Sequence, residues 1–252
     1  MIHPIFLSIV MPAYNEQPHI ESVIREHVQT ITRLADSLRD WEIVCLDDGS
    51  DDSTAAVIET LSQQNNKIRL IRHAQNKGIF QSQTDLYLDA RGTHIYSTGS
   101  DGQWPAANLL KMFPVLTAGA DLVVGVRQNR QEIYSLRRRV VSHAFNLLPK
   151  ILFGLGTRDA GSVKLGLREA FTCNVISRSP FAEAERIIRA HKRGYRVEFV
   201  PIEFLPRTHG KAKGASLRNV VASLGDCFRL ARRIKHEETV APMAPSQARD
   251  DS

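Results

Sequence analysis

The fold of this 252-residue chain is best read from His94-Ile95-Tyr96-Ser97-Thr98-Gly99-Ser100-Asp101-Gly102-Gln103-Trp104-Pro105. The first four residues have the pattern of a short strand, and a helical pattern follows Pro105. Asp101 therefore stands just beyond a strand, with glycines and an amide beside it. Hard divalent cations prefer such oxygen ligands, and Mg²⁺ often combines one or two carboxylates with substrate phosphates. Asp-Gly pairs are also common in turns, so this stretch alone leaves a simple turn open.

Strand and helix patterns alternate through the first half of the chain. Short apolar runs typical of buried strands cover residues 7–11, 42–46, 68–71 and 94–97. Apolar residues at helical spacing lie between them, at residues 19–38, 52–61 and 79–90. This alternation predicts an α/β fold with a mostly parallel sheet flanked by helices. Further strands are expected at residues 121–126 and 197–202.

Polar clusters follow three of the expected strands. They are Pro12–Glu16, Asp47–Thr54 and the stretch around Asp101. Ligands of parallel sheets bind at the carboxyl ends of the strands, so we expect the three clusters to meet at one edge. Asp47 and Asp48 directly follow a buried strand, and two adjacent carboxylates there would repel unless a ligand or cation used them.

Helix capping is the expected role of Asp51 and Ser53 in the second of these clusters. Both residues precede a helical pattern, and short polar side chains are favoured at that position. We therefore do not assign them to a ligand.

The chain carries a formal net charge of +6, with a pI of about 9.4, which favours an anionic partner. A nucleotide, a phospholipid surface or a nucleic acid would satisfy the charge. Nucleic-acid binding is not expected, because no reader motif and no interleaved aromatic residues accompany the basic residues.

Two basic segments stand out in the second half. Five arginines lie between Arg127 and Arg139, and a glycine-punctuated basic loop covers residues 206–214. The arginines could line a solvated helix face, or could hold phosphate through bidentate hydrogen bonds. The loop fits either a flexible linker or a segment that closes over a diphosphate.

Residues 216–235 have the pattern of an amphipathic, basic helix. The alternatives are packing on the domain and lying on an anionic membrane surface. Residues 236–252 are polar and rich in Pro, Ala and Ser, which predicts a disordered tail. No run of about 18 apolar residues occurs, so no membrane-spanning helix is expected.

Several motifs, taken in order, resemble the family-two nucleotide-sugar glycosyltransferases of GT-A fold. They include Val10-Met11-Pro12-Ala13-Tyr14-Asn15-Glu16, Asp47-Asp48-Gly49-Ser50 and the strand from Gly194 to Ile202 with its following basic loop. Within that family the chain is most similar to the polyprenyl-phosphate mannose and glucose synthases. The resemblance extends from about residue 7 to about residue 230. It implies one GT-A domain over residues 1–235, a Rossmann-like mixed sheet with a C-terminal amphipathic helix.

The resemblance also implies roles for individual residues. Donor-nucleotide binding falls to Pro12, Tyr14, Glu16, Asp47, Asp48 and Ser50. Asp101 and Gln103 are expected to bind Mg²⁺ or Mn²⁺, and Asp101, Glu183 and Glu185 are expected to be catalytic. For the two glutamates the alternative is a solvated helix face. Phosphate or acceptor binding falls to Arg127, Arg139, Ser142, Lys164, Arg207, Lys211 and Lys213.

The sequence departs from the family pattern at the metal motif. The family usually carries Asp-x-Asp-x-Gln, whereas this chain has Gly99 in place of the first acid. One carboxylate is lost, which puts the strength of metal binding in question. An aspartate restored at position 99 is expected to tighten metal binding if the geometry is conserved. Larger residues also replace small ones after Gly78, at Gln81, Gln83, Asp85 and Tyr87. These departures suit an altered donor preference or a nucleotide-binding module that has lost its chemistry.

The activity implied is transfer of a hexose, with inversion, from a nucleotide diphosphate sugar to a polyprenyl phosphate. A soluble hydroxyl acceptor is the alternative, and it would need a carboxylate to take its proton, whereas a lipid phosphate is already an anionic nucleophile. We expect a cytoplasmic protein attached to the inner face of the membrane, with a membrane protein or a second copy of the chain as a possible partner.

Overall fold

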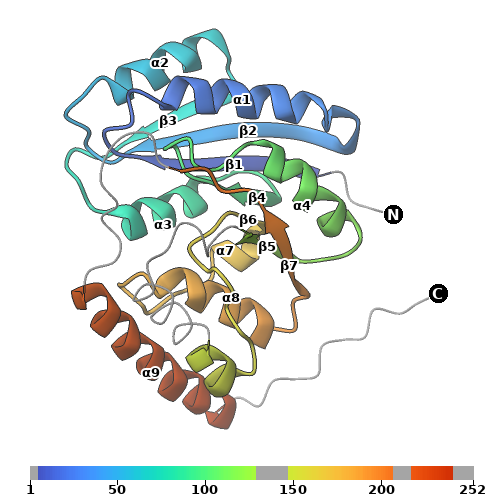
Figure 1. Cartoon of the computed structure of the whole chain (residues 1–252), viewed down its shortest axis with the longest axis vertical. Coiled ribbons are helices and arrows are strands. Elements are labelled where there is room, and N and C mark those ends of the chain that lie inside the picture. Colours follow the sequence, from blue (N-terminus) through green and yellow to red (C-terminus); the bar gives the residue numbers. More distant parts are fainter. Residues whose placement is uncertain (1–4, 129–146, 207–216, 241–252) are drawn as a thin grey trace.

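The computed structural model describes residues 5–128, 147–206 and 217–240. Its centre is a seven-stranded sheet with the order β3-β2-β1-β4-β6-β5-β7 (Figure 1). The strands are β1 (Ile5–Ala13), β2 (Leu38–Asp47), β3 (Ile68–Arg72), β4 (His94–Ser97), β5 (Leu122–Arg127), β6 (Lys164–Leu167) and β7 (Val197–Ile202). β6 runs antiparallel to β4 and β5, and the other pairs are parallel. The predicted mixed, mostly parallel sheet is therefore confirmed.

Helices cover both faces of this sheet. They are α1 (Ile20–Thr32), α2 (Thr54–Gln64), α3 (Ile79–Asp89), α4 (Ala107–Thr117), α7 (Arg168–Phe171), α8 (Ala182–Lys192) and α9 (Leu217–Val240), with a short 3₁₀ helix, η1, at Ala35–Ser37. Residues 147–153 are also helical. One apolar core joins the sheet to α1, α2 and α4, and a second joins it to α3, α7 and α8.

The central strand β1 explains how the two cores arise from one sequence. Ile9 belongs to the first core and its neighbour Val10 to the second, because successive side chains of a strand point to opposite faces. Both side chains are fully buried. Burying one such side chain stabilises the fold by about 1.5–3 kcal/mol. A continuous apolar run is therefore what a strand covered on both faces requires.

The prediction differs from the structure at the ends of two helices and at one strand. The first helix ends at Thr32, not Leu38, because Leu38 already begins β2 and pairs with Ile5. β6 was not predicted. The last helix continues to Val240, so the expected tail begins within it.

The expected caps of α2 also need correction. Ser53 occupies the capping position, but its side chain makes no capping hydrogen bond. The backbone N–H of Thr54 donates instead to Asp52, which also accepts from the backbone N–H of Gln17. Asp52 thereby links the loop after β1 to the start of α2.

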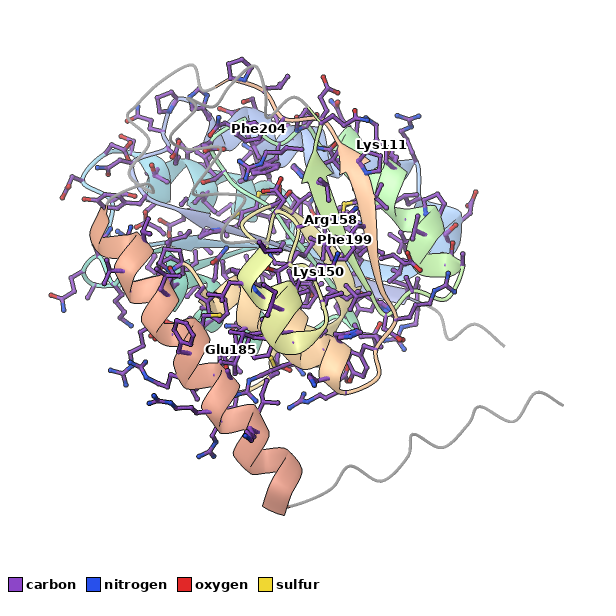
Figure 2. All side chains as sticks on the ribbon, turned by 60° about the horizontal axis from the view of Figure 1, so that its bottom comes forward. Lys111, Lys150, Arg158, Glu185, Phe199 and Phe204 are labelled. Carbon is purple, nitrogen blue, oxygen red and sulfur yellow. The ribbon has the colours of Figure 1, made fainter. Side chains whose placement is uncertain are left out.

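A third apolar cluster attaches α9 to the domain. Cys227, Leu230 and Ile234 are buried against Phe153 and against Ile188 of α8. Figure 2 shows α9 lying along the helix that carries Lys150, with Glu185 close by. α9 also exposes Val221, Leu224 and Phe228, which lie outside this packed face. Among the described residues, no helix combines the length and apolar character needed to cross a membrane.

All three cysteines are free and buried. Burial raises the pKa of the Cys45 thiol to about 12 and that of Cys227 to about 11. These thiols therefore stay neutral and act as small apolar side chains.

Candidate active site

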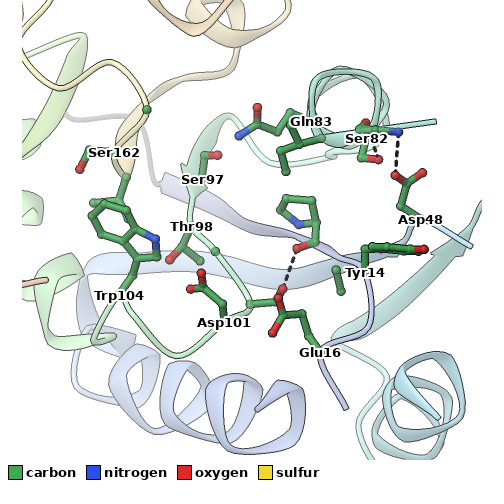
Figure 3. A pocket seen from close by; sticks show the side chains of 18 of the residues that line it. Tyr14, Glu16, Asp48, Ser82, Gln83, Ser97, Thr98, Asp101, Trp104 and Ser162 are labelled. Atoms are coloured by element: carbon green, nitrogen blue, oxygen red, sulfur yellow. Dashed lines mark hydrogen bonds between the residues drawn. The ribbon is translucent and has the colours of Figure 1, made fainter. Parts of the chain in front are cut away.

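A cavity of about 770 Å³ opens at the carboxyl ends of β1, β2 and β4 (Figure 3). Several segments line it. They are the end of β1 and the loop after it (Pro12, Ala13, Tyr14 and Glu16), Asp48 after β2, the residues around the start of α3 (Asn76, Gly78, Ile79, Ser82 and Gln83), the end of β4 and the loop after it (residues 97–101 and Trp104), and Gly161, Ser162 and Val163 before β6. We call it the strand-end cavity. The three polar clusters that the sequence singled out do meet at this edge of the sheet.

Hydrogen bonds between two loops shape the first wall of the strand-end cavity. Ser50 Oγ accepts from the backbone N–H of Asn15 at 2.9 Å, and Asn15 Oδ1 accepts from the backbone N–H of Asp51 at 2.9 Å. Asn15 adopts a φ of 56°, a conformation that asparagine tolerates better than most residues. Ser50 therefore holds the loop that presents Tyr14 and Glu16, and it does not itself line the cavity.

Asp48 is an anchor for the loop on the opposite rim. Its carboxylate accepts hydrogen bonds from the backbone N–H groups of Lys77 (2.9 Å) and Gly78 (2.8 Å), and its Oδ1 lies 2.6 Å from His73 Nδ1. Partial burial would raise the pKa of Asp48, but these hydrogen bonds outweigh it and hold the pKa below its usual value. Protein hydrogen bonds alone therefore stabilise this carboxylate. The expectation that repulsion between Asp47 and Asp48 requires a ligand or cation is thus corrected.

Asp47 points to a different set of partners. It is almost fully buried, accepts from the backbone N–H of Ser50, and lies 3.9 Å from the Arg72 guanidinium. It does not line the strand-end cavity. The adjacent aspartates therefore serve separate loops.

Replacing Asp48 with asparagine is expected to loosen the rim formed by residues 76–78. The change removes charge-assisted hydrogen bonds, each of which contributes about 1.5–3 kcal/mol. Urea unfolding should show a loss of that size, and isothermal titration should show weaker binding of UDP or GDP. Asp51→Asn, an exposed carboxylate in the same turn, is the control and should change neither. Wild-type stability and affinity in Asp48→Asn would refute the anchoring role.

The end of β4 supplies the acidic wall of the strand-end cavity. Asp101 lines it, and the backbone N–H of Gln103 donates to Asp101 Oδ1 at 3.2 Å. The Gln103 side chain donates to the Leu205 carbonyl oxygen at 3.1 Å and is not among the lining residues. Within the described residues no group of three or more His, Cys, Asp or Glu side chains is arranged to hold a metal. A divalent cation here would rest on Asp101 together with phosphate oxygens of a ligand, which suits Mg²⁺.

Gly99 cannot accept a side chain without movement of Trp104. A Cβ atom at position 99 would lie 2.9 Å from Trp104 Cδ1 and 3.1 Å from Nε1. Real Cβ atoms essentially never come within 3.0 Å of a neighbour. The expectation that Gly99→Asp tightens metal binding is therefore corrected, because the indole occupies the space that the aspartate needs.

Arg127 is engaged by the protein itself. Its guanidinium forms a bidentate ion pair with Asp159 and lies 4.9 Å from the centre of the Phe204 ring and 5.4 Å from that of Trp104. Arg127 is not among the lining residues. It therefore supports the wall formed by Trp104 and residues 161–163 rather than facing the strand-end cavity.

Glu183 and Lys164 form a buried ion pair behind the floor of the strand-end cavity. Lys164 Nζ lies 2.9 Å from Glu183 Oε2, and Arg186 Nε lies 3.2 Å from Glu183 Oε1. Lys164 is 2% exposed and Glu183 4% exposed. Burial would raise the pKa of Glu183, but Lys164 and Arg186 outweigh it and lower the pKa. The predicted acceptor lysine and catalytic glutamate thus neutralise each other, and the solvated-face alternative is wrong.

The cluster of Glu183, Lys164, Arg186 and Tyr87, here the Glu183 cluster, reaches the strand-end cavity only indirectly. The Tyr87 hydroxyl donates to Glu183 Oε2 at 3.1 Å and lies 2.9 Å from Ser97 Oγ. Ser97 lines the cavity. Two cations face one carboxylate, so the floor has an excess of positive charge beneath it.

Glu185 is also structural in its contacts. It accepts hydrogen bonds from the backbone N–H groups of Ile176 and Ser177, and Arg189 Nε lies 2.7 Å from its Oε1. The side chain is fully buried and does not line the strand-end cavity. Five further candidates, Arg139, Ser142, Arg207, Lys211 and Lys213, lie outside the described residues.

Sequence reasoning did not assign several residues that line the strand-end cavity. They include Asn76, Ser82, Gln83, Ser97, Ser162 and Trp104. The unusual size of Gln83 after Gly78 was a usable signal. So was the pairing of Gly99, where an acid is usual, with a tryptophan five residues later.

The fold and the strand-end cavity together define a GT-A glycosyltransferase. The sequence matches Glycosyl transferase family 2 over residues 8–183, and the chain belongs to that family.

Curated relatives include the undecaprenyl-phosphate 4-deoxy-4-formamido-L-arabinose transferases of Salmonella choleraesuis (strain SC-B67) and Salmonella typhimurium (strain LT2). Each is 29% identical over 228 residues, which cover 88% of this chain and 67% of the relative.

Solved structures of similar fold include glucosyl-3-phosphoglycerate synthase from Mycobacterium tuberculosis in complex with Mn²⁺, UDP and phosphoglyceric acid. Its TM-score is 0.65 at 21% identity, with 88% of this chain and 78% of that chain covered. Mannosyl-3-phosphoglycerate synthase from Rubrobacter xylanophilus also has a TM-score of 0.65, at 18% identity, with 97% and 79% covered. These likenesses confirm the predicted fold.

Proposed function

We propose that this glycosyltransferase moves a sugar from a nucleotide diphosphate sugar to a polyprenyl phosphate at a membrane surface. The acceptor phosphate oxygen would attack the anomeric carbon as the bond to the diphosphate breaks, and the nucleoside diphosphate would leave. The observation that carries this proposal is the strand-end cavity, with Asp48 on one rim and Asp101 on the acidic wall.

A divalent cation on Asp101 fits the chemistry of the leaving group. When bound, Mg²⁺ or Mn²⁺ would neutralise charge that develops on the diphosphate. Two structures of the Mycobacterium tuberculosis synthase contain UDP with Mn²⁺ or with Mg²⁺, which supports the same class of ligand here. The chain's own contribution is to hold Asp101 in place through the Gln103 backbone, and to keep positive charge beneath Ser97.

A phosphate acceptor agrees with the state of the buried glutamates. Glu183 and Glu185, the carboxylates proposed to take a proton, are both held in ion pairs away from the strand-end cavity. A hydroxyl acceptor requires a general base within hydrogen-bond reach, whereas a phosphate monoester is already nucleophilic. The names of the curated relatives specify undecaprenyl phosphate, which favours the same acceptor class.

Exposed apolar side chains on α9 and on the helical residues 147–153 support attachment to a membrane surface. The apolar part, here the apolar stripe, consists of Val221, Leu224 and Phe228, which are 62%, 36% and 52% exposed. Leu147, Ile151 and Leu152 are exposed on the neighbouring helix, which lies beside α9 in Figures 1 and 2. Exposed basic residues accompany them, namely Lys150, Arg229, Arg232, Arg233 and Lys235. Apolar side chains flanked by cations suit the surface of an anionic bilayer.

Flotation with phosphatidylglycerol vesicles should therefore recover the protein at low salt and much less at high salt, because salt screens the electrostatic part. Changing all three residues of the apolar stripe to glutamine should abolish recovery at low salt. Their exposure means that the fold is kept, whereas deleting α9 would remove the packing of Leu230 and Ile234.

Leu88→Gln is the matched control for flotation, because Leu88 is 57% exposed on α3. It should float like the wild type. Equal recovery of the triple variant and the wild type would show that the apolar stripe does not bind the membrane.

The activity is tested by a screen of UDP- and GDP-sugars against a polyprenyl phosphate, with the product identified by mass. A polyprenyl-phosphate sugar formed in the presence of Mn²⁺ is the expected result. Transfer only to a soluble hydroxyl compound, or no transfer from any nucleotide sugar, would overturn the proposal.

A further inference from the structure

Trp104 forms a fixed wall of the strand-end cavity beside Asp101. Its ring packs on Phe204 with 4.6 Å between ring centroids, and the Arg127 guanidinium lies 5.4 Å from its centre. Arg127 is in turn held by Asp159. Figure 3 shows the indole nitrogen on the edge of the ring that faces Thr98 and Asp101. The orientation of this N–H is therefore set by packing around it.

The indole N–H has no protein acceptor within the described part of the chain. Trp104 is half-buried and lines the strand-end cavity. A tryptophan N–H in such a position normally finds a hydrogen-bond partner. Its N–H therefore remains available to whatever occupies the cavity, whether solvent or a bound ligand.

The Trp104 N–H and the Asp101 carboxylate lie close to the same point in the cavity wall. The position that a Cβ of residue 99 would take lies 3.1 Å from Trp104 Nε1 and 3.4 Å from Asp101 Oδ1. A bare anion beside Asp101 would be repelled, but a phosphate oxygen that shares a cation with Asp101 would not. The N–H then supplies a directed hydrogen bond to an oxygen of the same diphosphate. Charge-assisted hydrogen bonds of this kind are the stronger ones.

We propose that the Trp104 indole N–H donates a hydrogen bond to a non-bridging diphosphate oxygen of the nucleotide donor. This inference rests on the proposed function and goes beyond it by assigning a specific binding role to Trp104. In the place where the family usually has an acid, this chain presents a hydrogen-bond donor. The diphosphate of the nucleotide sugar would then be bound partly by direct contact with Trp104 and not by the cation alone.

Trp104→Phe separates this role from simple packing. Phenylalanine keeps an aromatic ring against Phe204 and Arg127 but removes the N–H together with part of the ring area, so the melting temperature is measured beside the affinity. Isothermal titration of UDP and GDP with Mn²⁺ should show affinity about tenfold weaker than for the wild type, the factor that corresponds to about 1.4 kcal/mol. The melting temperature should change little. Unchanged UDP and GDP affinity, with weakening seen only for the nucleotide sugar, would place the contact on the sugar and overturn the proposal.

A fluorescence measurement gives a second readout. The chain has two tryptophans, Trp41 and Trp104, so Trp41→Phe leaves Trp104 as the single reporter. Addition of the nucleotide that binds should shift or quench its emission, and an unchanged spectrum at saturation would contradict the contact.

Gly99→Ala tests the geometry independently. The added methyl group should displace the indole and weaken nucleotide binding, and this effect should shrink in the Trp104→Phe background, as a coupled pair requires. Equal effects in both backgrounds would refute the geometry. If the wild type binds neither nucleotide, the proposed donor class itself is wrong; if the wild type binds and Trp104→Phe binds equally well, only this inference fails.

Discussion

Asp101→Asn is expected to lower kcat/KM for sugar transfer by about 1000-fold, which corresponds to a loss of roughly 4 kcal/mol of transition-state stabilisation. The reason is that Asp101 is the acidic residue of the β4-end motif that lines the strand-end cavity. A cation on this carboxylate contributes several kcal/mol by neutralising charge on the leaving diphosphate. Asparagine keeps an oxygen that can accept from the Gln103 N–H, so the loop should stay folded. Transfer rates measured across a Mn²⁺ titration would give the effect.

The same titration should show that Asp101→Asn has lost Mn²⁺-dependent binding of nucleotide diphosphate. Asp36→Asn is the control, since Asp36 is an exposed carboxylate in η1. It should retain full activity. Wild-type binding and transfer in Asp101→Asn would remove this residue from the metal site.

Glu183→Ala is expected to destabilise the fold by about 3–5 kcal/mol, the range measured when one partner of a buried ion pair is removed. Lys164 and Arg186 would then be left buried without their carboxylate. Chemical unfolding at neutral pH would measure the loss. The pKa of Glu183 is lower in the folded protein than its ordinary value of 4.5. Its contribution to the free energy of unfolding is therefore complete above pH 4.5. The contribution disappears as the pH falls through the folded-state pKa. The difference in stability between the wild type and Glu183→Ala should therefore narrow in acid.

Glu198→Ala is the matched control for this experiment. Glu198 pairs with Arg196 at the surface, where side-chain exposure is 41% and 57%. Exposed pairs contribute at most about 1 kcal/mol, so little change is expected. A second variant, Lys164→Met combined with Glu183→Leu, should recover only part of the lost stability, because it removes the unpaired Lys164 charge but leaves Arg186 without its carboxylate. A Glu183→Ala protein as stable as the wild type would show that the ion pairs of the Glu183 cluster do not stabilise the fold.

The parallel strands could be predicted from the sequence because both faces of the sheet are buried, so each strand is a continuous run of apolar residues. Ile9 and Val10 illustrate this, since each is buried in a different core. β6 was not predicted because it has only four residues, Lys164–Leu167, and begins with a lysine, a residue type that is usually exposed. The approach of Glu183 from α8, together with a hydrogen bond from Lys164 to the Ser162 carbonyl oxygen, makes the burial of Lys164 tolerable. A pairing across such a distance in the chain leaves no periodic signal.

The candidate site was predictable in its place but not in its details. Strand ends followed by Asp48 and Asp101 identified the right edge of the sheet, because parallel strands gather their carboxyl ends there. The partners of each carboxylate were not predictable. Asp48 binds backbone N–H groups of Lys77 and Gly78, which carry no side-chain signature. Charge alone likewise could not reveal that Arg127 is committed to Asp159.

The contact between Gly99 and Trp104 has a consequence for how sequences of this type can change. An aspartate at position 99 would collide with the indole, and a smaller residue at position 104 would leave the N–H missing while the acid is still absent. Each single step toward a two-acid motif is therefore unfavourable, although both steps together need not be. Positions 99 and 104 should accordingly covary among descendants, with glycine accompanying tryptophan and an acid accompanying a smaller side chain. Because a substitution at either position is unfavourable alone, this pair would separate related proteins into two groups that bind the diphosphate of the nucleotide sugar differently.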